Sequence, residues 1–259
     1  ERDYPAVPYM TANFQIPDCG IVSYADRAQV QECDLLGLDD LDQANPDTRA
    51  KIVAYLNDLM AIGVDGIRID AAKHIPAHEL SLVLSDVISS PVIYTEIIEA
   101  FGEPVQGFEY FNDGLVTEFD YSKELGFAFS GHGSCTGNLA SLAGFGASAS
   151  LMRSGSAFVF VDNHDNQRGH GTANPCIVTH QDGAIYELAN VFMLGWPYGN
   201  TRVMSSYYFT DDTHGPPADG SGNTDDIYVG GTLVGCNGSD WVCEEMYTNS
   251  AELDLGSNS

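Results

Sequence analysis

The first regular pattern in the chain is an amphipathic helix that begins after Asn45. Asn45 is a favourable N-cap residue, Pro46 suits the first helical position, and Gly63 is placed to end the helix. One face of this helix carries Ile52, Leu56, Leu59 and Met60. Residues 1–45 contain prolines and glycines that interrupt any period, so we expect loops and short irregular elements there.

Apolar strands then alternate with helices. Short apolar runs predict strands over residues 66–70, 92–97, 115–121, 157–163 and 202–206. One predicted helix carries Leu80, Val83, Leu84, Val87 and Ile88 on its apolar face, and another covers residues 185–194. Strands joined through helices form parallel pairs with right-handed crossovers. The sequence therefore predicts an α/β fold with five strands in a parallel sheet.

Three carboxylates lie at the C-terminal ends of the strongest apolar strands. Asp70 ends GIRID, Glu96 ends VIYTE, and Asp165 follows the strand predicted over 157–163. The C-terminal edge of a parallel sheet is where active sites form, so these carboxylates are candidates for acid/base and nucleophilic chemistry. Two carboxylates about 5–5.5 Å apart would suit a retaining glycosidase. The alternative is that each carboxylate only caps a following helix.

Basic and polar residues accompany these carboxylates. Arg68 lies inside an apolar strand, where a buried guanidinium needs an anionic partner. His164 is either functional or a loop histidine whose hydrogen bonds are satisfied locally. Lys73 and His74 follow the Asp70 strand and are either functional or simply solvated.

Composition narrows the possible partners. The chain has 259 residues, 37 acidic and 10 basic, and a formal net charge of −27. A hydrophobic share of 44% is enough for a sizeable core and excludes global disorder. So few basic residues argue against nucleic-acid and membrane-surface partners. The acidity favours a saline habitat over an ordinary acidic secreted protein, and neither explanation bears on the fold.

The cysteines predict an oxidising compartment. There are six, and no metal-binding spacing occurs among them. An extracellular disulfide protein fits this pattern best. Short loops suggest that Cys19 pairs with Cys33 and Cys236 with Cys243, which leaves Cys135 with Cys176, although the sequence alone leaves the pairing open. We expect a secreted protein whose leader has been removed or whose chain is incomplete.

Three segments resemble signature regions of the α-amylase family of glycoside hydrolases, and especially its chloride-dependent, animal-type members. They are GIRIDAAKH (66–74), IYTEII (93–98) and FVDNHDNQRGHG (160–171). Further similar segments are RDYPAVPY, GEP, VTEFDY, PYGNTRVMSSY, GPP and DWVCE. The resemblance runs in order across almost the whole chain.

The resemblance implies a role for each candidate. Asp70 matches the nucleophile, Glu96 the general acid/base, and Asp165 the third acid, which orients the sugar and stabilises the transition state. His164 matches a histidine that binds sugar hydroxyls. The other implied substrate-binding positions are Tyr24, Arg68, Lys73, His74 and Glu103.

Two ions are also implied. Arg68, Asn163 and Arg202 match the three groups that hold chloride in the family. Asp40 matches a calcium carboxylate, and the backbone carbonyls of Gln31 and His74 match two further calcium contacts.

The implied fold is the (β/α)8 TIM barrel of α-amylases. The five predicted strands would be the fourth to eighth of the barrel, so we expect an incomplete barrel in this chain. Residues 1–45 would be the C-terminal part of the domain inserted between strands 3 and 4, and residues 46–259 the C-terminal part of the catalytic barrel. One calcium ligand and one cleft histidine would lie in the missing part.

The implied function is endo-hydrolysis of α-1,4-glucosidic bonds in starch, glycogen and maltooligosaccharides, with retention, by a monomeric enzyme. One alternative is a transglycosylase of the same family, against which the chloride-type residues and animal-type motifs weigh. The other is an inactive fragment or a non-catalytic glucan-binding relative, and the presence of all three acids weighs against the non-catalytic relative.

Overall fold

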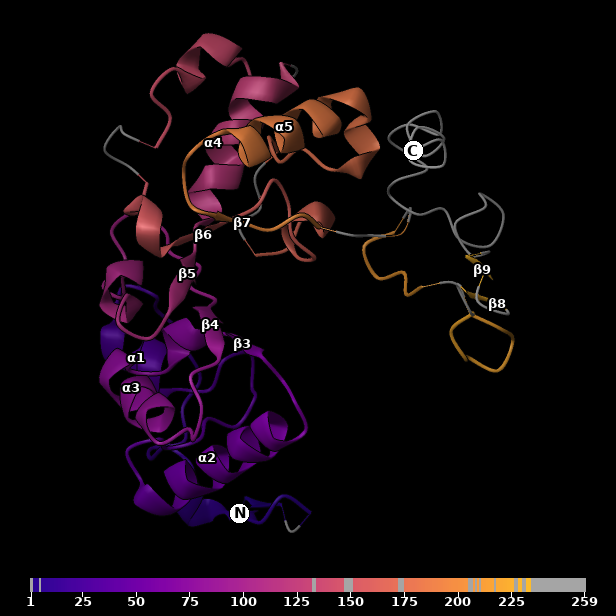
Figure 1. The fold of residues 1–259 in the computed structure, drawn as a ribbon. Helices are drawn as coiled ribbons and strands as arrows, with labels where there is room; N and C mark the ends of the chain where they lie inside the picture. Colours follow the sequence, from indigo (N-terminus) through magenta and orange to yellow (C-terminus); the bar gives the residue numbers. More distant parts are fainter. Residues whose placement is uncertain are drawn as a thin grey trace. The chain divides into compact units, whose positions relative to one another are not determined.

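The computed structural model describes residues 2–4, 6–131, 134–146, 151–171, 175–204, 207, 209, 211–216, 218–225, 228–229 and 232–233. The chain divides into two compact units (Figure 1). Unit 1 comprises Glu1–Thr117 and Met152–Phe158, and unit 2 comprises Glu118–Leu151 and Val159–Ser259. The predicted disulfide between Cys236 and Cys243 lies outside the described residues, as does the end of the strand predicted over 202–206.

Unit 1 is built around parallel strands that pair in chain order. Strand β3 pairs with β4, β4 with β5, and β5 with the first two residues of β6, all in parallel. Two short strands near the N-terminus, β1 and β2, form a separate antiparallel pair. The elements are β1 (Asp3–Tyr4), β2 (Tyr9–Met10), α1 (Arg27–Glu32), α2 (Pro46–Ala61), β3 (Gly66–Ile69), α3 (Ala77–Ser85), β4 (Val92–Thr95), β5 (Leu115–Thr117) and β6 (Ala157–Val159).

Helix α2 begins and ends where its local sequence signals predict. The Asn45 side chain accepts the N–H of Asp47, and Pro46 opens the helix. At the other end Gly63 has a positive φ of 98°, and the N–H of Val64 donates to the carbonyl of Leu59 at 3.1 Å. This is the Schellman arrangement, which satisfies carbonyls at the end of a helix.

One apolar cluster forms the core of unit 1. Its buried members are Val30, Ala72, Leu80, Ile97, Val105, Tyr110 and Val116. The Tyr110 hydroxyl donates to the carbonyl of Ile75 at 2.8 Å and accepts from the Gln31 side chain at 3.2 Å. Because these bonds join α1 to the segment after β3, the core fixes the loops that leave the C-terminal ends of the strands.

Unit 2 pairs its helices over an aromatic core. Helices α4 and α5 contact each other. The ring of Tyr121 stacks on that of Tyr198 with centroids 5.7 Å apart, and Phe119 meets Phe160 edge-on at 5.2 Å. The N–H of Arg202, just after β7, donates to the carbonyl of Val159 at 2.8 Å. The elements are α4 (Phe119–Ser130), α5 (Ala184–Gly195), β7 (Asn200–Thr201), β8 (Tyr228–Val229) and β9 (Thr232–Leu233).

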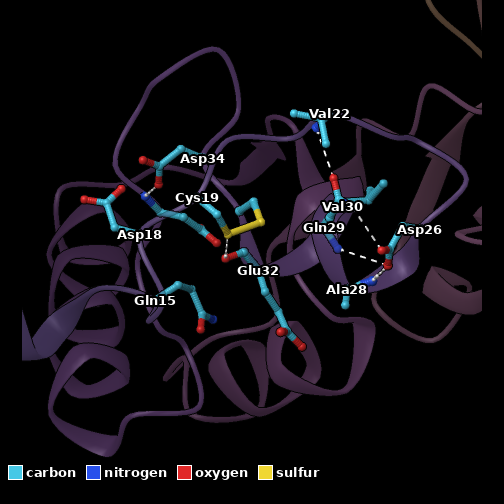
Figure 2. Close-up of a disulfide and its surroundings, with 12 residues drawn as sticks. Gln15, Asp18, Cys19, Val22, Asp26, Ala28, Gln29, Val30, Glu32 and Asp34 are labelled. Atoms are coloured by element: carbon cyan, nitrogen blue, oxygen red, sulfur yellow. Dashed lines mark hydrogen bonds between the residues drawn. A yellow bond between two sulfur atoms is a disulfide. The ribbon is translucent and has the colours of Figure 1, made fainter.

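Two of the three expected disulfides are confirmed. Cys19 is bonded to Cys33 in unit 1, and Cys135 to Cys176 in unit 2. Figure 2 shows the first beside α1, where the Asp26 carboxylate caps the helix by accepting the N–H groups of Ala28 and Gln29. The six-residue helix α1 therefore lies between a side-chain cap and a disulfide.

Several predicted boundaries are wrong. The strand predicted over 115–121 ends at Thr117, because the Glu118 carboxylate accepts the N–H of Asp120 and starts α4. Helix α3 ends at Ser85, so Val87 and Ile88 are not on its face. The strand predicted over 157–163 ends at Val159, and β7 at 200–201 precedes the predicted 202–206. Among the described residues, no helix has the length and apolar character needed to cross a membrane.

Candidate active site

Two of the three candidate acids follow adjacent parallel strands of unit 1. Asp70 comes directly after β3, and Glu96 comes directly after β4. The N–H of Glu96 donates to the carbonyl of Ile69 at 2.9 Å, so the strand pairing continues up to the acids. Their environments differ, because the side chain of Asp70 is 72% exposed and that of Glu96 only 9%.

Arg68 links the two acids. One terminal nitrogen of its guanidinium donates to the Asp70 carboxylate, and the other donates to Glu96 Oε1 at 2.6 Å. Burial lowers the pKa of Arg68, but the two carboxylates together raise it further, so the net direction is upward and the guanidinium stays charged. The anionic partners that the sequence demanded for Arg68 are therefore these two acids.

A strained backbone position helps to hold Glu96. Ala71 has a left-handed conformation, with φ at +47° and ψ at +30°, which residues other than glycine seldom adopt. In this conformation its N–H donates to Glu96 Oε2 at 3.1 Å. The sequence does not predict this donor, because nothing in an alanine side chain signals a left-handed backbone.

The predicted cleft residues of unit 1 lie together. Lys73 is 5% exposed, forms an ion pair with Glu103, and donates to the carbonyl of Ile98 at 2.7 Å. Its ammonium also lies 5.1 Å from the ring centroid of Tyr24, which meets the His74 ring edge-on at 6.1 Å. Lys73 is therefore not the solvated side chain that the sequence left open.

The third candidate acid lies in unit 2, in a loop where Asn163 and Asn166 each accept the backbone N–H of the other. Asn163 Oδ1 accepts the N–H groups of Asp165 at 3.2 Å and Asn166 at 2.8 Å. In return, the N–H of Asn163 donates to Asn166 Oδ1 at 2.7 Å. His164 Nε2 lies 3.4 Å from the Asp165 carboxylate. Asp165 makes no capping bond with its own side chain to the helical turn that follows, which speaks against the simple helix-cap explanation for this acid.

A pocket of about 370 Å³ lies beside Asp165 within unit 2. It is lined by His164, Asp165, Gln167, Arg168, His170, Met204 and Tyr207. Arg168 supports this wall by donating to the carbonyls of Asp212 and His214 at 2.8 and 3.0 Å. Five of the lining residues, at positions 167, 168, 170, 204 and 207, were not among the sequence candidates, although three of them belong to the same FVDNHDNQRGHG segment.

Asp40, which the sequence predicts as a calcium ligand, has a carboxylate suited to a cation. Its buried oxygen Oδ2 has no hydrogen-bond partner among the residues that the structure describes, and burial together with Asp34 and Glu79 raises the pKa of Asp40 to about 7. Such an oxygen fits a cation. No cluster of three or more His, Cys, Asp or Glu side chains that could hold a metal occurs among the described residues, so calcium here would need carbonyl ligands, which it accepts.

The two predicted carbonyl ligands of calcium lie on elements that contact each other. Helix α1 holds Gln31, and the helical turn Ala72–His74 packs against it. His74 Nδ1 lies 2.8 Å from the carbonyl of Val30. For chloride, Arg68 lies in unit 1 and Asn163 and Arg202 lie in unit 2, and the guanidinium of Arg68 is already paired with carboxylates.

The comparisons with known proteins agree on one family. The chain is 40% identical to α-amylase from Tenebrio molitor and to human α-amylase 1B, in each case over 95% of this chain and 52% of the relative. The crystal structure of α-amylase I from Eisenia fetida matches with a TM-score of 0.85 at 35% identity, covering 95% of this chain and 54% of that one. The chain is homologous to animal α-amylases. It spans about half the length of the curated relatives it matches.

The homology confirms the predicted fold. The parallel strands and their helices correspond to part of the (β/α)8 barrel of these α-amylases. No protein-family model matches the chain. A second Eisenia fetida structure, of a variant of the same enzyme in complex with maltohexaose, matches with a TM-score of 0.84.

Proposed function

We propose that the intact protein hydrolyses α-1,4-glucosidic bonds inside starch, glycogen and related glucans, with retention of configuration. The observation that carries this proposal is the bridge from Arg68 to both Asp70 and Glu96 at the ends of neighbouring strands. Homology to α-amylases supports the substrate class, as does the maltohexaose bound to the Eisenia fetida relative.

In the first step, a carboxylate oxygen of Asp70 attacks the anomeric carbon of the bound glucan. The glycosidic bond breaks, and its electron pair stays on the leaving oxygen, which takes a proton from Glu96. The exposure of Asp70 lets it meet the substrate, while the burial of Glu96 and its two donors hold the acid in one position.

In the second step, Glu96 acts as a base. Its carboxylate removes a proton from a water molecule, the water oxygen attacks the anomeric carbon, and the bond from that carbon to Asp70 breaks. Each step inverts the anomeric centre, so the product keeps the original configuration. Arg68 keeps its charge throughout, so it can stabilise both carboxylates as their protonation and bonding change.

Asp165 and His164 are assigned to the sugar. A carboxylate near the anomeric centre stabilises positive charge in the oxocarbenium-like transition state, and carboxylate and imidazole both hydrogen-bond hydroxyl groups. The 370 Å³ pocket supports this assignment because His164 and Asp165 line it together with the polar residues Gln167, Arg168 and His170. We assign four residues of unit 1 to binding of the same substrate, because the contacts described above bring their side chains together: Tyr24, Lys73, His74 and Glu103.

Calcium and chloride are proposed as the resident ions. Asp40, with the carbonyls of Gln31 and His74, would hold calcium, which binds carboxylate and carbonyl oxygens and would neutralise the buried Asp40 charge. Arg68, Asn163 and Arg202 would hold chloride. The Asn163 oxygen is used by two backbone N–H groups, so its amide nitrogen is the side-chain atom suited to an anion.

The remaining assignments concern the location of the enzyme, its partners and its division into domains. The two disulfides support an extracellular location, and we propose a secreted monomer without nucleic-acid or membrane partners. We also propose that residues 1–45 end an inserted domain and that residues 46–259 belong to the catalytic barrel.

The test uses the intact protein with starch as substrate. Asp70→Asn removes the nucleophile and Glu96→Gln the proton donor, so each variant should lose several orders of magnitude in kcat. Asp65→Asn is the matched control, because Asp65 is exposed at the opposite end of β3 and should leave kcat unchanged. Near-normal hydrolysis by either active-site variant would refute the assignment. Products longer than the substrate would instead support the transglycosylase alternative.

A further inference from the structure

Phe101 is the most exposed large apolar side chain among the residues that the structure describes. It lies in the loop that leaves β4, five residues after Glu96. Single exposed apolar residues are ordinary on protein surfaces, so exposure alone assigns nothing to Phe101. What distinguishes Phe101 is the turn that carries it and the residues on either side of that turn.

The turn that presents Phe101 is fixed at both ends. The N–H of Ala100 donates to Glu103 Oε2 at 3.0 Å, and the N–H of Glu103 donates back to the carbonyl of Ala100 at 3.1 Å. Gly102 supplies the positive φ of 85° that the turn needs. The ammonium of buried Lys73 holds Glu103 and the carbonyl of Ile98. The ring of Phe101 is therefore held out in solvent by a braced loop.

The same lysine connects this turn to a second exposed ring. Tyr24 is 41% exposed, and the Lys73 ammonium lies 5.1 Å from its ring centroid. In the Lys73–Glu103 ion pair, Lys73 thus has an exposed aromatic ring beside it, and Glu103 follows Phe101 by two residues in the same turn. A surface that combines apolar ring faces with charged hydrogen-bonding groups matches a sugar, which has apolar faces and hydroxyl groups at its edges.

We propose that Phe101 is a further substrate-binding residue, whose ring stacks on the apolar face of a glucosyl unit of a long glucan. This inference rests on the proposed function, in which Glu96 lies against the bond that is cleaved. Five residues of extended chain span at most about 17 Å, so Phe101 lies within oligosaccharide reach of Glu96. Because the Phe101 ring is fully exposed whereas Glu96 is buried, we assign the ring to a glucosyl unit outside the cleaved bond, and Phe101 should act on long glucans and not on short ones.

The experiment compares chain lengths in the intact protein. With a long α-1,4-glucan, Phe101→Ala should raise KM about fivefold, equivalent to about 1 kcal/mol, because one ring face loses its apolar contact. The value of kcat should stay within about twofold, and kcat/KM for maltotriose should not change. Phe101→Trp should restore the KM for the long glucan, since it keeps a flat aromatic face. Phe108→Ala is the control, because Phe108 is also exposed in unit 1 but lies outside this turn.

The possible outcomes distinguish a failure of the role proposed for Phe101 from a failure of the proposed hydrolysis of glucans. If the wild-type protein hydrolyses the long glucan but Phe101→Ala leaves its KM unchanged, the role of Phe101 is refuted and the proposed function stands. If the wild-type protein does not hydrolyse glucans at all, the proposed function itself fails. A lower Tm for Phe101→Ala without any length-dependent change in KM would show that another part of the protein covers this ring, which also overturns the inference.

Discussion

Helix α4 approaches the backbone at Cys176 so closely that only glycine fits at position 126. A Cβ atom added to Gly126 would lie 1.8 Å from the carbonyl oxygen of Cys176 and 2.8 Å from its carbonyl carbon. Both atoms belong to the backbone, and Cys176 is bonded to Cys135, so no side-chain rotation can relieve the contact. Gly126→Ala should therefore destabilise unit 2.

Two effects of opposite sign decide the magnitude. Alanine is favoured over glycine inside a helix by up to about 1 kcal/mol. Forcing an extra methyl group into a packed core costs about 1–3 kcal/mol, and the upper end applies here because the backbone itself must shift. We expect a net loss of about 1–2 kcal/mol, which corresponds to a fall in Tm of about 2–8 °C at roughly 2–4 °C per kcal/mol.

The assay is thermal unfolding of the intact protein. Gly195→Ala in α5 is the matched control, because an added Cβ there meets no atom of the described part of the chain within 4 Å, and its Tm should stay constant or rise. Removing both Cys135 and Cys176 should reduce the additional cost of Gly126→Ala, because the segment at 176 can then move away. If Gly126→Ala melts no lower than Gly195→Ala, the close approach of α4 to Cys176 is not real and the reasoning fails.

Three further predictions concern ions. Tm should rise between dilute buffer and molar sodium chloride, because salt screens the repulsion of a chain with a net charge of −27; a flat or falling curve would contradict this. At constant ionic strength, replacing chloride by a large anion should lower activity and move the basic limb of the pH profile toward acid, since a chloride near Glu96 disfavours ionisation of that carboxyl group. Arg202→Gln should abolish this response to chloride. Equal activity in both salts would exclude a functional chloride site. Asp40→Asn should weaken calcium binding at least about tenfold, the loss typical when a partner in the outer shell of a metal site is removed, whereas Asp65→Asn should not. Titration calorimetry measures both affinities, and an unchanged affinity in Asp40→Asn would remove Asp40 from the site.

The sequence predicted most reliably the features that depend on short local patterns. The caps at Asn45 and Gly63 set both ends of α2, because each works through bonds to residues only a few positions away. Apolar runs likewise predicted Asp70 and Glu96 at the C-terminal ends of their strands, and the structure places each acid directly after its strand. Parallel pairing then brings those two strand ends to one edge, so the closeness of the two acids followed from topology.

The sequence failed where two structures compete for one apolar segment. The run after Leu115 suits a strand or a buried helix equally, and the Glu118 cap decides for helix α4. The left-handed backbone of Ala71 has no sequence signal at all, since the surrounding structure imposes it. The same holds for Lys73, whose burial depends on Glu103 and on the carbonyl of Ile98, which lies 25 residues away in the chain.

The few basic residues of the chain determine how salt affects the charges at the site. In a chain with 10 basic and 37 acidic residues, several cations lie in partly buried pairs: the exposed side-chain fractions are 10% for Arg2, 24% for Arg68 and 6% for Lys73. Salt screens exposed charges strongly and buried pairs much less. Screening should therefore relieve the repulsion among surface carboxylates while it leaves the ion pair of Arg68 with the buried Glu96 largely intact. The stability of the protein and the charge arrangement at Glu96 can consequently respond to salt independently, which lets an acidic surface of this kind coexist with a site that depends on a few fixed positive charges.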